Sequence, residues 1–191
     1  NHYYERLLSV RAGGKNAWQP QLVRREQYEF YSQYHHSVIR SLIDLSGFRG
    51  DYEQLARAVR PRITASQARK SVELLLRLGL VEHGPKGAYR LTGKSIATPP
   101  QMSEVAVQKF HEQSALLALR SINELPRDRR NVSGLTLGIS RKTYETMCEE
   151  IRVFRTKLLR MAEEDNEADS VYQLNFQFFP VSNGTTEGGK E

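Results

Sequence analysis

Between residues 62 and 90 the sequence combines leucine-rich stretches with polar side chains that carry paired hydrogen-bond donors or a positive charge. Gln67 and Arg69 are residue types that can form two parallel hydrogen bonds with the edge of a DNA base. Lys70 is a residue type that binds phosphate oxygens. The candidate contact residues are Arg62, Thr64, Ser66, Gln67, Arg69, Lys70, Lys86 and Arg90. Their chemistry predicts a surface that contacts double-stranded DNA.

The excess positive charge of the chain is concentrated in the same region. The whole chain has 28 Lys and Arg residues against 22 Asp and Glu residues, a net charge of +6. Residues 51–94 contain nine of the basic and four of the acidic residues, a balance of +5, whereas residues 95–191 have a balance of −2. A local basic surface is the usual electrostatic footprint of phosphate binding, although solvated arginines on helix faces give the same count.

Two helices are expected before the candidate residues. Apolar residues at helical spacing predict a long helix over 26–45. Asp51 can cap a short helix over 52–59. This second helix should end before Pro61, because a residue that precedes proline disfavours the helical conformation.

A third helix and a hairpin are expected to position the candidate side chains. Thr64 is the predicted N-cap of a helix over 64–78, which Gly79 ends. The buried face of this helix should consist of Ala68, Val72, Leu75 and Leu76. Residues 80–83 and 88–92 are predicted to form two strands, because glycines flank the Pro-Lys pair between them.

The C-terminal half is expected to be a mixed module. Helical spacing predicts helices over 103–124 and 141–164, the second of which is capped by Ser140. Alternating apolar residues predict strands at 135–139 and 171–180. We expect these strands to pair, parallel or antiparallel, beneath the long helix. Because two strands make a marginal sheet, pairing across a dimer interface is expected to complete a four-stranded one.

The predicted fold class is mainly α with a small β component (α+β): a winged helix-turn-helix followed by a helical module with a small two-stranded sheet. The expected segments are an N-terminal helix and connector (1–24), the winged helix-turn-helix (25–94), a C-terminal dimerisation or sensing module (95–182) and a disordered tail (183–191). In such a fold the helix over 64–78 would enter the major groove, which is about 12 Å wide.

The residue patterns of common enzymes and metal sites are missing from the sequence. We find no P-loop, no dinucleotide-binding glycine pattern and no nucleophile elbow, so we expect neither catalysis nor a cofactor. The histidines do not have the spacing of a metal site. His35 and His36 are adjacent and point in different directions on a helix, so we expect one in the core and the other exposed.

Three further features predict a cytoplasmic protein with no membrane partner. Cys148 is the single cysteine of the chain and cannot form an internal disulfide. No apolar run approaches the roughly 18 residues needed to cross a bilayer. The first residues do not have the pattern of a signal peptide, and the absence of an initial Met predicts a piece of a longer protein or a renumbered chain.

Four separated sequence blocks occur in the order found in a known bacterial family. They are the runs at 31–40, 62–80, 133–140 and 171–180. On these blocks the chain resembles a family first catalogued as a paralogous set in Fibrobacter succinogenes, whose members look like transcriptional regulators. In that family a phage-repressor-like helix-turn-helix usually precedes the region seen here, which is a domain of unassigned function. The resemblance implies that this preceding domain reads the bases, and it implies no catalytic residue and no ligand.

The expected function is that of the regulatory region of a transcriptional regulator, with a winged helix that contacts DNA and a C-terminal module that dimerises or senses a signal. One alternative is a protein-interaction or dimerisation scaffold that never touches DNA. Another is a small-molecule sensor with a pocket lined by Tyr28, Tyr31 and Phe110, although core packing explains these aromatic residues as well. The expected partners are double-stranded DNA and a second copy of the chain, and the sequence identifies no small-molecule effector.

Overall fold

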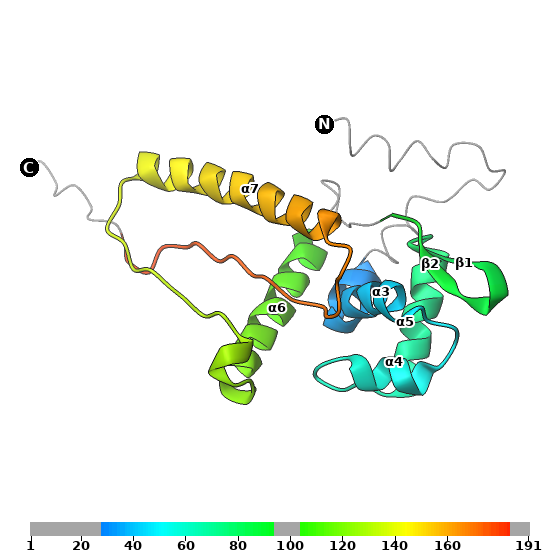
Figure 1. Ribbon diagram of the computed structural model, residues 1–191. Coiled ribbons are helices and arrows are strands. Elements are labelled where there is room, and N and C mark those ends of the chain that lie inside the picture. Colours follow the sequence, from blue (N-terminus) through cyan, green and yellow to red (C-terminus); the bar gives the residue numbers. More distant parts are fainter. Residues whose placement is uncertain (1–27, 94–103, 184–191) are drawn as a thin grey trace, which may run out of the picture.

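The computed structural model describes residues 28–93 and 104–183, which form a mainly helical protein with one small antiparallel sheet (Figure 1). The elements in chain order are α3 (Tyr34–Ser46), α4 (Tyr52–Ala58), α5 (Ala65–Arg77), β1 (Val81–His83), the short turn η1 (Pro85–Gly87), β2 (Tyr89–Leu91), α6 (Glu104–Glu124), the short turn η2 (Arg127–Arg129) and α7 (Arg141–Glu164). The expected α+β composition is confirmed. The segment expected at 1–24 and all but the first residue of the tail expected at 183–191 lie outside the described residues.

The first described helix is interrupted where one long helix was expected over 26–45. The residues just before Gln33 are helical, but Gln33 itself has extended backbone (φ −133°, ψ 121°) and α3 begins after it. The apolar spacing continues through this break, so the pattern alone did not reveal it. Tyr31 is buried before the break and meets the ring of Phe110 edge-on, with 5.8 Å between ring centroids. α3 ends at Gly47, whose φ of +57° is a conformation that favours glycine.

Side-chain caps start α4 and α5 at the residues expected from the sequence. The Asp51 carboxylate accepts a hydrogen bond from the Gln54 amide at 2.9 Å. The Thr64 hydroxyl accepts one from the Gln67 amide at 3.2 Å, and the Gln67 side-chain oxygen accepts one from the Thr64 amide at 2.9 Å. These reciprocal bonds form a capping box. Gly79 follows α5 with a φ of +63°, so the expected end of this helix is also confirmed.

The expected hairpin is present directly after α5. β1 and β2 pair antiparallel, with Val81 opposite Leu91 and His83 opposite Tyr89. The carbonyl of Phe48, in the turn between α3 and α4, accepts a hydrogen bond from the Tyr89 amide at 3.0 Å. The turn between α3 and α4 therefore lies beside β2, and this hydrogen bond connects the hairpin with the helices.

The hydrophobic core lies almost entirely in residues 28–93. The buried apolar side chains of this range are Phe30, Tyr31, Ile39, Ile43, Phe48, Leu55, Ala56, Val59, Ala68, Val72, Leu74, Leu75 and Val81. In the described C-terminal range only Ala106 and Ser114 are buried, and none of the 24 residues of α7 is. The C-terminal range therefore leaves most of its apolar side chains in contact with water.

The two strands expected at 135–139 and 171–180 do not form. Both segments are irregular, with neither helix nor strand, and no backbone hydrogen bond joins them within the described residues (Figure 1). α7 instead packs against the second segment, where the ring of Tyr144 stacks on that of Phe178 at 4.8 Å. Alternation predicts which side chains share a face, but pairing also needs a neighbouring strand, which is a non-local property. The predicted C-terminal two-stranded sheet is therefore wrong for the single chain.

Both His35 and His36 are buried, whereas one of them was expected to be exposed. The reason is that α3 is covered on one side by α5 and on another by α6 (Figure 1). The Ser71 hydroxyl donates its hydrogen to the Gln67 carbonyl at 2.9 Å. Its oxygen is therefore the acceptor in the bond with His36, and His36 Nδ1–H donates to Ser71 Oγ over 2.8 Å. Burial, with a smaller contribution from the neighbouring His35, lowers the pKa of His36 to about 4. Burial also lowers the pKa of His35.

Candidate nucleic-acid interface

α5 buries one face and leaves the polar residues of its first turns outside. Its buried residues are Ala68, Ser71, Val72, Leu74 and Leu75. The predicted face is thus right at three positions, but Leu76 is only half-buried and Leu74 is buried in its place. The predicted buried residues lie along one narrow stripe of the helix. α5 is contacted by α3, α4 and β1 and therefore buries a wider part of its surface.

All eight candidate contact residues are exposed. Six of them lie before or in the first turns of α5, and the other two lie on the hairpin. The turn that carries Arg62 is held by the hydroxyl of Tyr34, which donates to the Pro61 carbonyl at 2.7 Å. Because these side chains are exposed, the described C-terminal residues do not cover them, and the surface at the start of α5 is open to a partner.

Arg69 is held in place by an aromatic ring of α4. Its guanidinium carbon lies 4.4 Å from the ring centroid of Tyr52, a cation–π contact. Burial, and next a side-chain hydrogen bond with Tyr89, raise the pKa of Tyr52 to about 12. Tyr52 therefore connects α5 with β2 and orients the Arg69 guanidinium. Sequence reasoning missed this residue, although an aromatic residue at the first position of a short helix was a visible signal.

Gln67 is engaged in the cap, and in this conformation its side-chain oxygen is not free to accept from a base. Its side-chain oxygen accepts hydrogen bonds from the amide and the hydroxyl of Thr64, at 2.9 and 3.1 Å. A carboxamide that pairs with adenine must both accept and donate, and the two lone pairs of this oxygen are already occupied. Only the NH₂ group of Gln67 remains for a ligand.

The two hairpin candidates occupy the tip and the second strand of the hairpin. Lys86 occupies the tip, in a left-handed conformation with a φ of +56°. Arg90 lies opposite Glu82, and the ring of its neighbour Tyr89 packs on Phe48. Because successive strand residues point to opposite faces, Arg90 is on the outer face of the hairpin, beside an acidic residue. The structure thus gathers the six candidates at the start of α5 and separates Arg90 from them.

The described residues offer few other sites for chemistry. Among them no group of histidine, cysteine and acidic residues could hold a metal ion. Of the three aromatic residues of the expected sensor pocket, Tyr31 is buried against Phe110, whereas Tyr28 is 41 % exposed. A shallow depression of about 540 Å³ is lined only by residues of α7. No helix within the described ranges has the length and apolar character needed to cross a membrane.

These features define a mainly helical α+β protein in which a group of exposed basic and hydrogen-bonding side chains lies at the start of α5. The chain belongs to the family described as Domain of unknown function (DUF4423), whose model matches residues 15–181. No curated protein and no solved structure matches the chain.

Proposed function

We propose that the chain is the regulatory region of a bacterial transcriptional regulator. Residues 25–94 act as a winged helix that contacts double-stranded DNA, and residues 95–182 dimerise or receive a signal. The order of three helices and a hairpin supports the winged-helix assignment. The hydrogen bond between Phe48 and Tyr89 supports it too, because it places a short extended stretch beside the hairpin, as a third strand would lie.

The observation that carries the proposal is the open cationic surface at the start of α5. Arg62, Arg69 and Lys70 are all exposed there. An α-helix fits the major groove, and cations on its first turns reach phosphates and base edges. Arg69 can still donate from the edge of its guanidinium while its face rests on the ring of Tyr52.

The expected binding mode is dominated by phosphate contacts rather than base reading. Gln67 is occupied by the cap, so Arg69 is the one candidate in the described helix that can read a base with two bonds. This agrees with the resemblance to regulators in which a preceding helix-turn-helix reads the sequence. The proposal places the protein in the cytoplasm and assigns it no catalytic step.

The proposal is tested by the salt dependence of binding to a duplex of random sequence. The double substitution Arg69→Ala with Lys70→Ala should weaken binding at least about tenfold and reduce the salt slope, since two phosphate or base contacts are removed. The matched control is Arg155→Ala with Lys157→Ala, which removes the same charge from exposed positions of α7. If both double variants bind as the wild type does, the assignment of α5 is wrong.

A second candidate function is an interaction scaffold that does not contact DNA. The exposure of apolar side chains favours it, because within the described residues 16 of the 17 large exposed hydrophobic side chains belong to residues 105–181. Such a protein would bind random duplex only weakly at low salt. Its wild type and both double variants would lose that binding together as salt rises, and this outcome separates it from the DNA-contacting regulator.

A further inference from the structure

Two drawn-out segments of the C-terminal range carry no charged residue. We call residues 131–140 the connector and residues 171–181 the terminal segment. Neither contains Asp, Glu, Lys or Arg, although these types make up 26 % of the chain. Their large exposed apolar side chains include Leu135, Leu137, Ile139, Tyr172, Leu174 and Phe179, and the most exposed, Leu135 and Tyr172, are each 84 % exposed.

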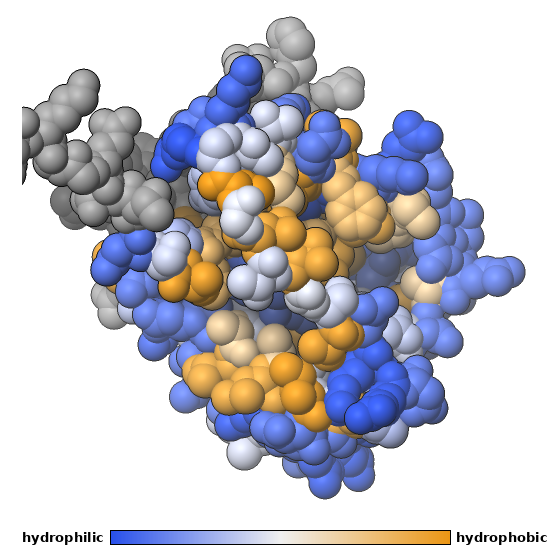
Figure 2. Space-filling view, turned by 90° about the vertical axis from the view of Figure 1, so that its left-hand side faces the viewer, coloured by the Kyte–Doolittle hydropathy of each residue, from blue (hydrophilic) through white to orange (hydrophobic). Residues whose placement is uncertain are grey.

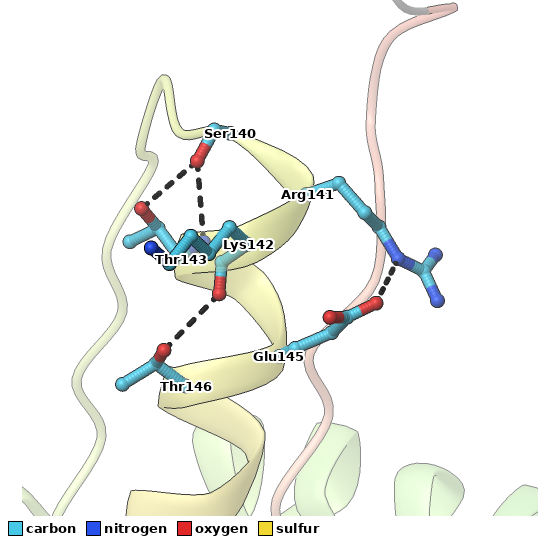
Figure 3. Close-up of polar contacts among 6 residues, drawn as sticks. All are labelled: Ser140, Arg141, Lys142, Thr143, Glu145 and Thr146. Atoms are coloured by element: carbon cyan, nitrogen blue, oxygen red, sulfur yellow. Dashed lines mark hydrogen bonds and ion pairs between the residues drawn. The ribbon is translucent and has the colours of Figure 1, made fainter.

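The connector is fixed at both of its ends. At one end the Arg130 guanidinium donates to the carbonyl of Ser121, at 3.0 Å, and to those of Ile122 and Leu125 at the end of α6. At the other end the Ser140 hydroxyl accepts a hydrogen bond from the Thr143 amide at 3.2 Å and caps α7 (Figure 3). The nine residues between these two anchors, 131–139, are all exposed to water.

The terminal segment is fixed on the helices by different contacts. The Asn175 side chain donates to the Ser114 carbonyl of α6 at 2.9 Å. The ring of Phe176 meets that of Phe154 of α7 edge-on at 6.2 Å. One side of the segment is thereby attached, while Tyr172 and other apolar side chains remain in water.

Both segments have unused backbone hydrogen-bonding capacity. Within the described ranges, no hydrogen bond between backbone groups involves residues 131–139 or 171–181. Natural proteins protect exposed strand edges with charged side chains, proline or bulges, because unpaired edges recruit other strands. Apart from Pro180 near its end, the two segments have no such protection. Their composition is that of strands that pair.

The apolar surface of the two segments is large enough to form an interface. Figure 2 looks onto the side of the molecule where α7 begins and the two segments lie, and hydrophobic side chains gather in patches across it. The large apolar residues that the two segments expose leave on the order of 1,000 Å² in water in total. About 800 Å² per partner is enough for a stable interface.

We infer that the partner that covers this surface is a second copy of the chain. The connector of each copy pairs with the terminal segment of the other, the two pairs join across the two-fold axis as one four-stranded sheet, and the two α7 helices cover it. This inference rests on the dimerising part of the proposed function and names its interface. The pairing is two-fold symmetric, so it uses every free segment in both copies and closes the assembly.

The composition of the segments favours a second copy over other partners. They offer no charge to an acidic or basic ligand, and they do not repel each other. Each copy has two unpaired segments of similar length, ten and eleven residues, so two copies provide matched partners. The terminal segment is attached to α6 and α7 through Asn175 and Phe176, so one of its sides is already occupied within the chain.

Sedimentation of the full chain over a range of micromolar concentrations tests this interface. The wild type should be a dimer. Leu135→Lys should raise the dimer dissociation constant at least about 100-fold, because the symmetric interface receives two buried charges at once. Tyr172→Lys should have the same effect. Both side chains are 84 % exposed in the single chain, so neither substitution should alter its fold, and an unchanged circular dichroism spectrum checks this.

The matched controls are Leu116→Lys and Leu119→Lys, which place the same charge on apolar positions of α6 that are 54 % and 55 % exposed. They should leave the dimer intact. A wild-type monomer at every concentration would overturn the inference, and so would a dimer that resists both Leu135→Lys and Tyr172→Lys. A monomer whose connector amides are nonetheless protected from hydrogen exchange would also overturn it, and would show that the same chain covers the connector.

The duplex-binding assay separates this inference from the DNA-binding proposal. If the wild type is monomeric but loses duplex affinity in the variant with Arg69→Ala and Lys70→Ala, the interface is wrong and the DNA contact stands. If the wild type dimerises through the two segments but binds duplex no better than that variant, the interface stands and the DNA contact is wrong.

Discussion

His36 is a buried titratable residue that connects two helices of the described core. It is 5 % exposed and bridges α3 to α5 through its hydrogen bond with Ser71. Its imidazole remains neutral there, because burial and the adjacent His35 disfavour the charged form. An unfolded chain has no such restriction, so protonation of this residue opposes folding.

The stability of the protein should therefore decrease as the pH falls. The folded pKa of His36 is about 4 and the ordinary value is 6.5, so between these values the unfolded state binds the proton more strongly. Stability is complete above about pH 6.5 and should fall by about 2 kcal/mol between pH 7.5 and pH 5. Urea unfolding at several pH values measures this. In the His36→Gln variant the dependence should weaken, and the part contributed by His35, whose pKa burial also lowers, should remain, whereas His83→Gln, in the exposed part of the hairpin, should retain the full dependence.

At the scale of the elements, helix starts depend on contacts between residues three apart. Thr64 and Gln67 form the capping box of α5, and Ser140 and Thr143 start α7 in a similar way (Figure 3). Such contacts are local, which explains why the sequence predicted these caps. The break at Gln33 was not predicted, because no comparable side-chain cap marks the start of α3.

Thr64→Ala should destabilise the protein by about 1 kcal/mol, because the amide at the third position of α5 loses its acceptor. The denaturant midpoint at neutral pH measures the change. Ser66→Ala is the matched control, since Ser66 is exposed in the same helix and makes no capping bond. If the two substitutions shift the midpoint equally, the cap does not contribute as described.

At the scale of the whole molecule, the two described ranges differ in how they bury apolar surface. Residues 28–93 enclose a core of their own, whereas α7 has no buried residue. Core burial makes stability independent of concentration, but structure completed by a second copy becomes more stable as the protein concentration rises.

Hydrogen exchange at two protein concentrations about 100-fold apart should therefore separate the ranges. Amides of α3 and α5 should exchange equally slowly at both concentrations. Amides of residues 131–139 and 171–181 should exchange more slowly at the higher concentration, because their hydrogen bonds form only in the dimer. Equal exchange of these two segments at both concentrations would contradict the division.

The sequence by itself determined the features that depend on neighbours along the chain. Helix periodicity, the caps at Asp51, Thr64 and Ser140, and the hairpin after Gly79 were all predicted and are present. Each is set by hydrogen bonds or side-chain contacts over a few residues, so each leaves a readable spacing.

Only the tertiary structure determined which side chains are buried and which residues far apart in the sequence contact each other. It buried both adjacent histidines, engaged Gln67 in its own cap, rested Arg69 on Tyr52, and left the connector and the terminal segment apart. Burial and strand pairing depend on which surfaces the folded chain brings together, and one-dimensional spacing does not encode that geometry. The same alternation that predicted a sheet within one chain fits a sheet between two chains equally well.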